Sequence, residues 1–198
     1  MAVNDLQVAN FCFSEYKRDD SPFPEHLRPG AGMYLIRIQV GHLAEAMKVL
    51  RKVRRSPSLI AIIPSLPAYA RKAWDELKPC TSKDPPEEYK RHVLQVRDKM
   101  TFHYDDEVVG EALEYLVSQG KRRGATAMWS DEPLTWRFNI ADLIVDTYKC
   151  RIVWEIPPDV DVREQADRQV MYAHGLAVSL LDFSGAFVFS FLEKHSAV

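Results

Sequence analysis

Residues 31–55 read AGMYLIRIQVGHLAEAMKVLRKVRR and contain no proline. Apolar side chains recur through this stretch at steps of three and four residues, which is the spacing of one face of an α-helix. The stretch ends in basic residues, and these suit the partly negative C-terminal end of a helix. We therefore predict a long amphipathic helix over 31–55, whose core-facing positions are Met33, Leu35, Ile36, Val40, Leu43, Met47 and Leu50.

Prolines divide the rest of the chain into shorter segments. The segment 18–30, RDDSPFPEHLRPG, is rich in proline and is predicted to be a loop, while 1–17 fits either a short strand or a helix. A proline is tolerated in the first turn of a helix, where its missing N–H costs nothing. Further helices are predicted over 67–78, from Pro85–Pro86 to about 103, from Asp105–Asp106 to Gly120, over 139–150 and over 161–194.

Residues 125–138 break the helical pattern. Two short runs with aromatic residues, AMWS and LTWRF, flank the turn-like tripeptide DEP, and this arrangement predicts a small β-hairpin. A chain of 198 residues is long enough to bury a core without disulfides or metals. We therefore expect a single domain over 1–198 that is mainly α, a helical bundle with a small β-hairpin insertion at about 125–138.

The charges of the chain nearly balance, with 26 Lys and Arg against 28 Asp and Glu. This balance excludes a broad basic surface for nucleic acid, so any such contact must come from a local patch. The three cysteines, Cys12, Cys80 and Cys150, lie far apart and lack the spacing of a zinc site. We expect a reducing, cytoplasmic location, with no metal and no cofactor.

The stretch from Val170 to Leu192 is the most apolar of the chain. It contains His174 and Asp182, and an unpaired charge near the middle of a membrane span is costly. The pattern therefore favours a buried core helix over a membrane span, and we expect no membrane partner. Phe183, Phe187 and Phe191, at four-residue spacing, are expected to pack within the chain or across a dimer.

The segment 96–105, VRDKMTFHYD, carries the residues that suggest chemistry. On a helix, Arg97, Met100 and His103 form one slanted stripe, with Arg97 and His103 about 9 Å apart along the axis. Their side chains are long enough to reach one phosphate between them, or to meet a second copy across a two-fold axis.

This segment resembles the motif of the HEPN superfamily, the higher eukaryotes and prokaryotes nucleotide-binding domains. That motif is an Arg, four to six residues and a His, often with a polar residue directly after the Arg, as Asp98 follows Arg97 here. The resemblance implies an α-helical homodimer that acts as a metal-independent endoribonuclease. It also implies a defence or toxin–antitoxin setting, with an antitoxin as a protein partner.

The implied chemistry needs few groups. RNA supplies its 2′-hydroxyl as nucleophile, a histidine near its ordinary pKa moves the proton, and a guanidinium holds the phosphate. Arg97 and His103 are thus the candidate catalytic residues, with Asp98 as an orienting group and Tyr104 as a hydrogen-bond donor to phosphate or base. The candidate contacts to RNA or nucleotide are Lys99, Arg122 and Arg123.

Several alternatives stay open. The Arg-to-His spacing also occurs in Arg37–His42 and in Arg168–His174. Arg97 could instead form ion pairs with Asp98 or with a Glu on a neighbouring helix, which would leave a non-catalytic helical module that binds nucleotide, RNA or protein. A further alternative is a subunit whose C-terminal helix serves assembly alone. The acidic run 105–107 beside His103 is expected to cap a helix rather than to bind a metal.

Overall fold

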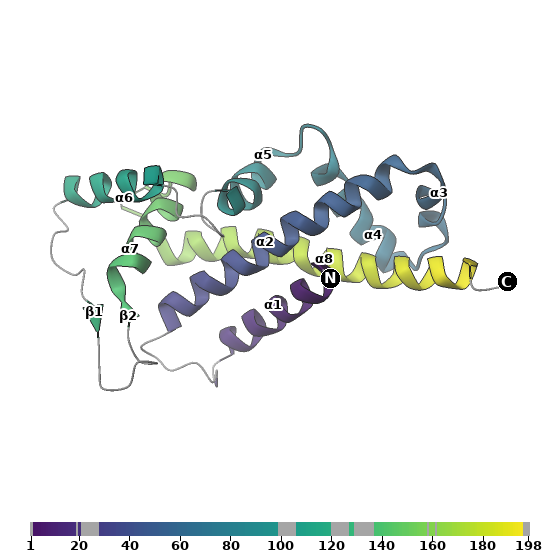
Figure 1. Ribbon diagram of the computed structural model, residues 1–198, viewed down its shortest axis with the longest axis horizontal. Coiled ribbons are helices and arrows are strands. Elements are labelled where there is room, and N and C mark those ends of the chain that lie inside the picture. Colours follow the sequence, from purple (N-terminus) through teal and green to yellow (C-terminus); the bar gives the residue numbers. More distant parts are fainter. Residues whose placement is uncertain are drawn as a thin grey trace.

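The computed structural model describes residues 2–18, 20, 28–98, 106–119, 127–128, 137–157, 159–160 and 162–195. The described part of the chain is mainly α and contains eight α-helices, with short 3₁₀ and π turns between some of them. One hydrophobic core draws side chains from α1, α2, α4 and α8. Figure 1 shows α8 running along the length of the molecule, with α2 crossing in front of it.

Helices α1 (Ala2–Lys17) and α2 (Arg28–Arg55) pack side by side. The helix predicted over 31–55 is confirmed, and of the two possibilities for 1–17 the structure has the helix. The predicted loop over 18–30 is wrong at its end, since α2 begins at Arg28 and Pro29 lies in its first turn, where a proline is tolerated. The helices approach closely at Gly32, where an added Cβ would lie 2.6 Å from Tyr16 Oη.

The segment after α2 is a series of short turns that ends in α4. Helix α3 (Pro57–Ile60) and the 3₁₀ turn η2 (Ile63–Ser65) precede α4 (Ala68–Leu77), and the 3₁₀ turn η3 (Lys78–Thr81) follows it. The predicted helix over 67–78 is thus confirmed to within a residue at each end. Its buried face is formed by Ala70, Ala73, Trp74 and Leu77.

The helix predicted to start after Pro85–Pro86 begins as α5 (Glu87–Tyr89) and continues as the π-helix η4 (Lys90–Leu94). Helical turns persist to residue 98, where the described part of the segment ends. The wider π turn, which the sequence pattern did not indicate, places His92 and Val93 in the core. Such turns are often found at functional sites.

Helix α6 (Asp106–Ser118) begins at the second residue of the acidic pair Asp105–Asp106, while Asp105 and the predicted stop at Gly120 lie outside the described residues. The two-residue strands β1 (Ala127–Met128) and β2 (Arg137–Phe138) pair antiparallel, with Ala127 opposite Phe138. The rest of the segment 125–138, where a hairpin was expected, also lies outside the described residues.

The helix predicted over 139–150 is α7 (Asn139–Thr147), extended by the π-helix η7 (Tyr148–Val153). The extension ends at Glu155, whose φ of 53° is left-handed. The amide of Ile156 donates back to the carbonyl of Cys150, six residues earlier, and this closes the end of the wide helix one residue further back than a Schellman hydrogen bond would. A glycine is the usual residue at this position, so Glu155 holds a conformation that costs an ordinary residue free energy.

Helix α8 (Val162–His195) matches the helix predicted over 161–194. Phe183 is buried and lies 5.0 Å, ring to ring, from Trp74 and 5.2 Å from Phe187, so the predicted phenylalanine packing within the chain is confirmed. The part from Val170 to His195 is long and apolar enough to cross a membrane by length and composition, and 33% of its most apolar window is buried. A core helix of a water-soluble protein meets the same criterion.

Candidate functional site

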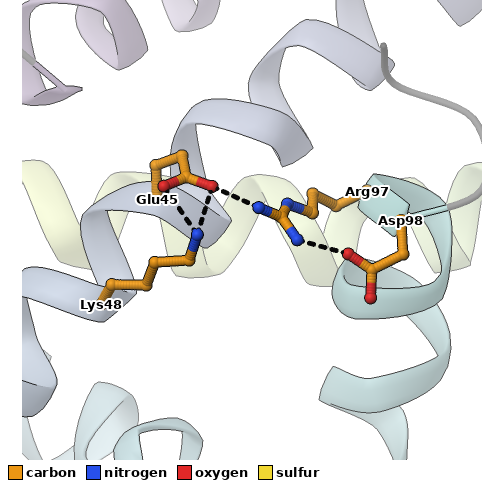
Figure 2. A network of polar contacts seen from close by, with 4 residues as sticks. All are labelled: Glu45, Lys48, Arg97 and Asp98. Carbon is orange, nitrogen blue, oxygen red and sulfur yellow. Dashed lines mark hydrogen bonds and ion pairs between the residues drawn. The ribbon is translucent and has the colours of Figure 1, made fainter. Parts of the chain in front are cut away.

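Arg97 lies on the helical segment that follows α5 and faces α2 (Figure 2). Its Nη2 donates to Glu45 Oε1 at 2.7 Å, and its Nη1 donates to Asp98 Oδ1 at 2.5 Å. Lys48, one turn further along α2, donates to both oxygens of Glu45, at 2.7 and 2.8 Å. Both ion pairs that the sequence offered as alternatives are present, one with Asp98 and one with a Glu on another helix, which is Glu45 of α2.

The two cations and two anions of this network stabilise one another's charged forms. The hydrogen bonds that Arg97 donates to Asp98 and to Glu45, in that order of importance, raise its pKa above the ordinary value. Hydrogen bonds from Lys48 and then Arg97 lower the pKa of the Glu45 carboxyl. The network thus joins two basic and two acidic side chains, whose formal charges cancel.

Solvent reaches every member of the network. The side chain of Arg97 is 34% exposed, and those of Glu45 and Asp98 are more exposed still. Ion pairs of this kind contribute about 0 to 1 kcal/mol each, because water and salt screen them. A phosphate could therefore replace the two carboxylates as the acceptor of the Arg97 hydrogen bonds, because little free energy is lost when those ion pairs break. Guanidinium–phosphate pairs are among the stronger polar contacts.

The other residues of the predicted site lie outside the described part of the chain. These are the candidate catalytic His103, the supporting Tyr104, and the candidate nucleic-acid contacts Lys99, Arg122 and Arg123. Of the predicted site, the structure therefore places Arg97 and Asp98 and brings those two together. Among the residues that it describes, no group of three or more His, Cys, Asp or Glu side chains is arranged to hold a metal ion.

The two other Arg–His pairs occupy different surroundings. The guanidinium of Arg37 lies 6.0 Å from the ring of Tyr34. His174 is half-buried, with its ring 5.4 Å from that of Phe13, and its Nδ1 lies 3.1 Å from Nε2 of the buried Gln39. The side chain of Arg168 lies outside the described residues.

Gln39 determines the state of the His174 ring. The amide nitrogen of a glutamine carries two hydrogens and can only donate. Gln39 Nε2 therefore donates one hydrogen to Asn10 Oδ1 at 2.9 Å and the other to His174 Nδ1. Nδ1 then acts as an acceptor, which assigns the proton of the neutral ring to Nε2. Burial lowers the pKa of His174, in agreement with a neutral ring at pH 7.

A surface pocket of about 510 Å³ lies beside His174, between α1 and α8. The ion pair of Lys17 and Asp167, at 2.8 Å, forms part of its wall. A larger pocket of about 830 Å³ lies against η3 and α5, and its wall mixes cations such as Arg54 and Lys78 with carboxylates such as Asp75.

Sequence reasoning missed a buried lysine. Lys149 on η7 is fully buried, its Nζ lies 4.3 Å from the ring centre of Trp154, and it has no hydrogen-bond partner among the described residues. Burial lowers its pKa from 10.5 to about 8. The nearby His92 is also buried, and burial together with the charges of Arg91 and Lys149 lowers its pKa to about 4.

Trp154 itself is buried in the core. No protein-family model matches the chain, and neither a curated protein nor a solved structure matches it. The interpretation of the site therefore rests on its own residues.

Proposed function

We propose that this protein is a HEPN-like, metal-independent endoribonuclease, with Arg97 holding the scissile phosphate and His103 as the general acid and base. The observation that supports it best is the setting of Arg97: a one-third exposed guanidinium, directly followed by Asp98 and held by carboxylates that solvent reaches. A helical bundle with a small β-hairpin, as expected for such a domain, is part of the same proposal.

In the proposed reaction, the 2′-oxygen of RNA attacks the adjacent phosphorus while the bond from phosphorus to the 5′-oxygen breaks. His103 takes the proton of the 2′-hydroxyl, and a proton is returned to the departing 5′-oxygen, so the products are a 2′,3′-cyclic phosphate and a 5′-hydroxyl. Arg97 stabilises the negative charge that develops on the phosphate oxygens. Asp98 holds the guanidinium in place until the phosphate displaces the carboxylate.

The proposal extends to the setting of the protein. We infer a cytoplasmic homodimer in a defence or toxin–antitoxin system, with an antitoxin as partner. The three cysteines are free thiols, and this agrees with a reducing compartment.

A chelator-resistant cleavage assay tests the activity. The purified protein is incubated with single-stranded RNA and excess EDTA, alone and as the variants Arg97→Ala and His103→Ala. We expect cleavage to fall by at least about a hundredfold in each variant, as is usual on loss of a proton-transfer or charge-stabilising group. The cleaved ends should be cyclic phosphates.

Matched controls come from the same chain. Arg91, on η4, is 39% exposed and pairs with Glu155 at 3.5 Å, so Arg91→Ala removes an ion pair of the same kind outside the motif. His42→Ala removes the histidine of another Arg–His pair. Both controls should retain cleavage. Absence of cleavage in EDTA, or cleavage that is unchanged in both Arg97→Ala and His103→Ala, would show that the proposal is wrong.

The second candidate is a non-catalytic helical module that binds nucleotide, RNA or a protein. The engagement of both Nη atoms of Arg97 by Glu45 and Asp98 favours it, because this arrangement is complete without a ligand. Fluorescence anisotropy with a labelled RNA distinguishes the two. Binding that is weakened by Arg97→Ala, with no product formed, supports the module over the enzyme.

A further inference from the structure

The pocket of about 510 Å³ between α1 and α8 combines apolar side chains with a few polar groups. Phe13, which is 2% exposed, contributes its ring, and Met171 contributes a half-exposed side chain. Pockets that bind small molecules have this size and this mixture, since apolar walls hold the ligand and a small number of polar groups orient it. The polar groups here are Ser14, Lys17, Asp167 and His174.

His174 presents a fixed hydrogen-bond donor to this pocket. Its Nδ1 accepts a hydrogen from Gln39, which is fully buried, so that edge of the ring is turned to the interior. The opposite edge, with Nε2, borders the pocket, and Nε2 carries the proton of the neutral ring. Asn10 accepts the other hydrogen of the Gln39 amide at 2.9 Å, which holds the amide in place behind the ring.

The position of this proton excludes one role for His174 and leaves another. A general base must offer a lone pair, and a protonated Nε2 has none, so His174 in this state takes no proton from Ser14 or from a ligand. It can donate a hydrogen bond to an oxygen of a ligand. The pocket is therefore suited to binding a hydrogen-bond acceptor rather than to hydrolysis.

The charges of the pocket suit a ligand with a single negative charge. Lys17 Nζ lies 5.9 Å from the ring centre of Phe13, and the His174 ring lies 5.4 Å from the same ring, so both donors border one apolar surface. Lys17 pairs with Asp167 at 2.8 Å, but these side chains are 44% and 62% exposed, so water screens the pair and a ligand can replace the carboxylate at small cost. Because Asp167 offsets Lys17, the pocket lacks the excess positive charge that a doubly charged phosphate favours.

We propose that this pocket binds a small carboxylic acid with an apolar body. The carboxylate takes the place of Asp167 beside Lys17 and accepts a hydrogen bond from His174 Nε2. The apolar body lies against Phe13 and Met171. The inference goes beyond the ribonuclease activity and does not depend on it, because its readout is the binding of a small molecule between α1 and α8.

Isothermal titration calorimetry tests the proposal, with 3-phenylpropionate and hexanoate as probes in a buffer free of carboxylate and phosphate. We expect a Kd of about 1 mM or below for at least one probe, as is usual for ligands of this size. The neutral isostere 3-phenylpropanamide should bind at least about tenfold more weakly than 3-phenylpropionate, because it offers no charge to the two donors. Inorganic phosphate should not displace either probe.

Variants at exposed positions locate the binding without disturbing the core. Lys17→Met should weaken binding at least about fivefold, and Met171→Asp, which places a negative charge on the wall, at least about tenfold. Lys90 is the matched control: it is 36% exposed and pairs with Asp84 at 2.6 Å, so Lys90→Met removes a similar ion pair elsewhere and should leave the Kd unchanged. Circular dichroism should show that each variant is folded.

Nuclear magnetic resonance tests the part of His174 and its positioning residue Gln39. The ¹⁵N chemical shifts of an imidazole distinguish a protonated from a bare nitrogen, and the signals that vanish in His174→Phe are those of His174. We expect the proton on Nε2 in the native protein, with a change in the Nε2 signal when 3-phenylpropionate is added. Gln39→Met keeps most of the side-chain volume, so the proton should redistribute between the two ring nitrogens and binding should weaken at least about threefold.

Four outcomes would overturn the proposal. The first is no saturable binding of either probe up to about 10 mM. The second is an amide or a phosphate that binds as tightly as the carboxylates. The third is a loss of affinity in Lys90→Met as large as that in Lys17→Met. The fourth is a native His174 with its proton on Nδ1. Failure of the ribonuclease proposal leaves all these measurements unaffected.

Discussion

Replacing Lys149 with methionine should stabilise the protein. Lys149 is fully buried on η7, and its Nζ has no hydrogen-bond partner among the described residues. Its pKa falls from 10.5 to about 8 because burial disfavours the ammonium form. At 1.36 kcal/mol per pKa unit, the folded protein carries a penalty of about 3 kcal/mol at pH 7. Lys149→Met removes the charge and keeps most of the side-chain volume.

One favourable contact is lost in the same change. The ammonium lies 4.3 Å from the ring centre of Trp154, and a desolvated cation–π contact contributes about 2 kcal/mol. The net gain in the free energy of unfolding at pH 7 is therefore about 1 to 3 kcal/mol. Urea denaturation measures it directly, through the midpoint at constant slope.

The pH dependence gives an independent check. Below pH 8 the lysine is charged in both states, so the folded state carries the whole penalty. Between about pH 8 and 10.5 the unfolded state binds more protons, so the free energy of unfolding rises with pH. The neighbouring Cys150 acts in the opposite direction, since burial raises its pKa from 9.0 to about 11. Both proteins contain Cys150, whose pKa Lys149 lowers, so the difference between native protein and variant reports Lys149 together with its effect on Cys150.

The advantage of Lys149→Met should thus shrink as the pH rises from 8 to 10.5. Lys48→Met is the control: this lysine is half exposed and pairs with Glu45, so the stability should change by less than about 1 kcal/mol. A variant less stable than the native protein at pH 7, or an advantage that does not vary with pH, would refute the reasoning.

Three further changes test other parts of the fold. His92 is buried, and its pKa is about 4 in place of the ordinary 6.5. Between these two pH values the unfolded state binds more protons than the folded state. Lowering the pH from 7 to 4 should therefore reduce the free energy of unfolding by up to about 3 kcal/mol. His92→Phe should flatten this loss in denaturation curves from pH 7 to 4, and an equally steep loss would contradict it. Gly32→Ala places a methyl group 2.6 Å from Tyr16 Oη and should cost about 1 to 3 kcal/mol in urea denaturation; an unchanged midpoint would show that the ring yields freely. Glu155→Gly relieves the left-handed φ of 53° but removes the exposed ion pair with Arg91, so we expect a gain of about 0.5 to 1 kcal/mol, seen as a higher melting temperature. A lower melting temperature would mean that the ion pair outweighs the backbone strain.

The helices were predictable because their signals are local. The three- and four-residue spacing in 31–55 and the prolines that flank 68–77 determine α2 and α4 without reference to the rest of the chain. The extra turns of η4 and η7 were not predictable, since a π turn differs from an α turn by one residue per hydrogen bond and leaves the apolar pattern almost unchanged.

The site was predictable in part, for the same physical reason. Asp98 follows Arg97 in sequence, so their pairing needs no tertiary information, whereas Glu45 comes from α2 and is separated from Arg97 by 52 residues. The burial of Lys149 is likewise a property of the assembled helices. Lysine side chains usually lie at the protein surface. The sequence of η7, YKCRIV, contains no pattern that predicts a buried Lys149.

The position of α8 has a consequence for how the chain reaches its folded state. Its polar contacts close loops of 150 residues from Lys17 to Asp167, 135 from Gln39 to His174 and 103 from Glu76 to Ser179. Contacts between such distant parts of a chain form slowly, because the entropy of closing the loop is lost before the contact is gained. During synthesis α1, α2 and α4 emerge long before α8, and the apolar side chains that contact α8 have no cover until it arrives. Completion of the core is therefore a late step in folding.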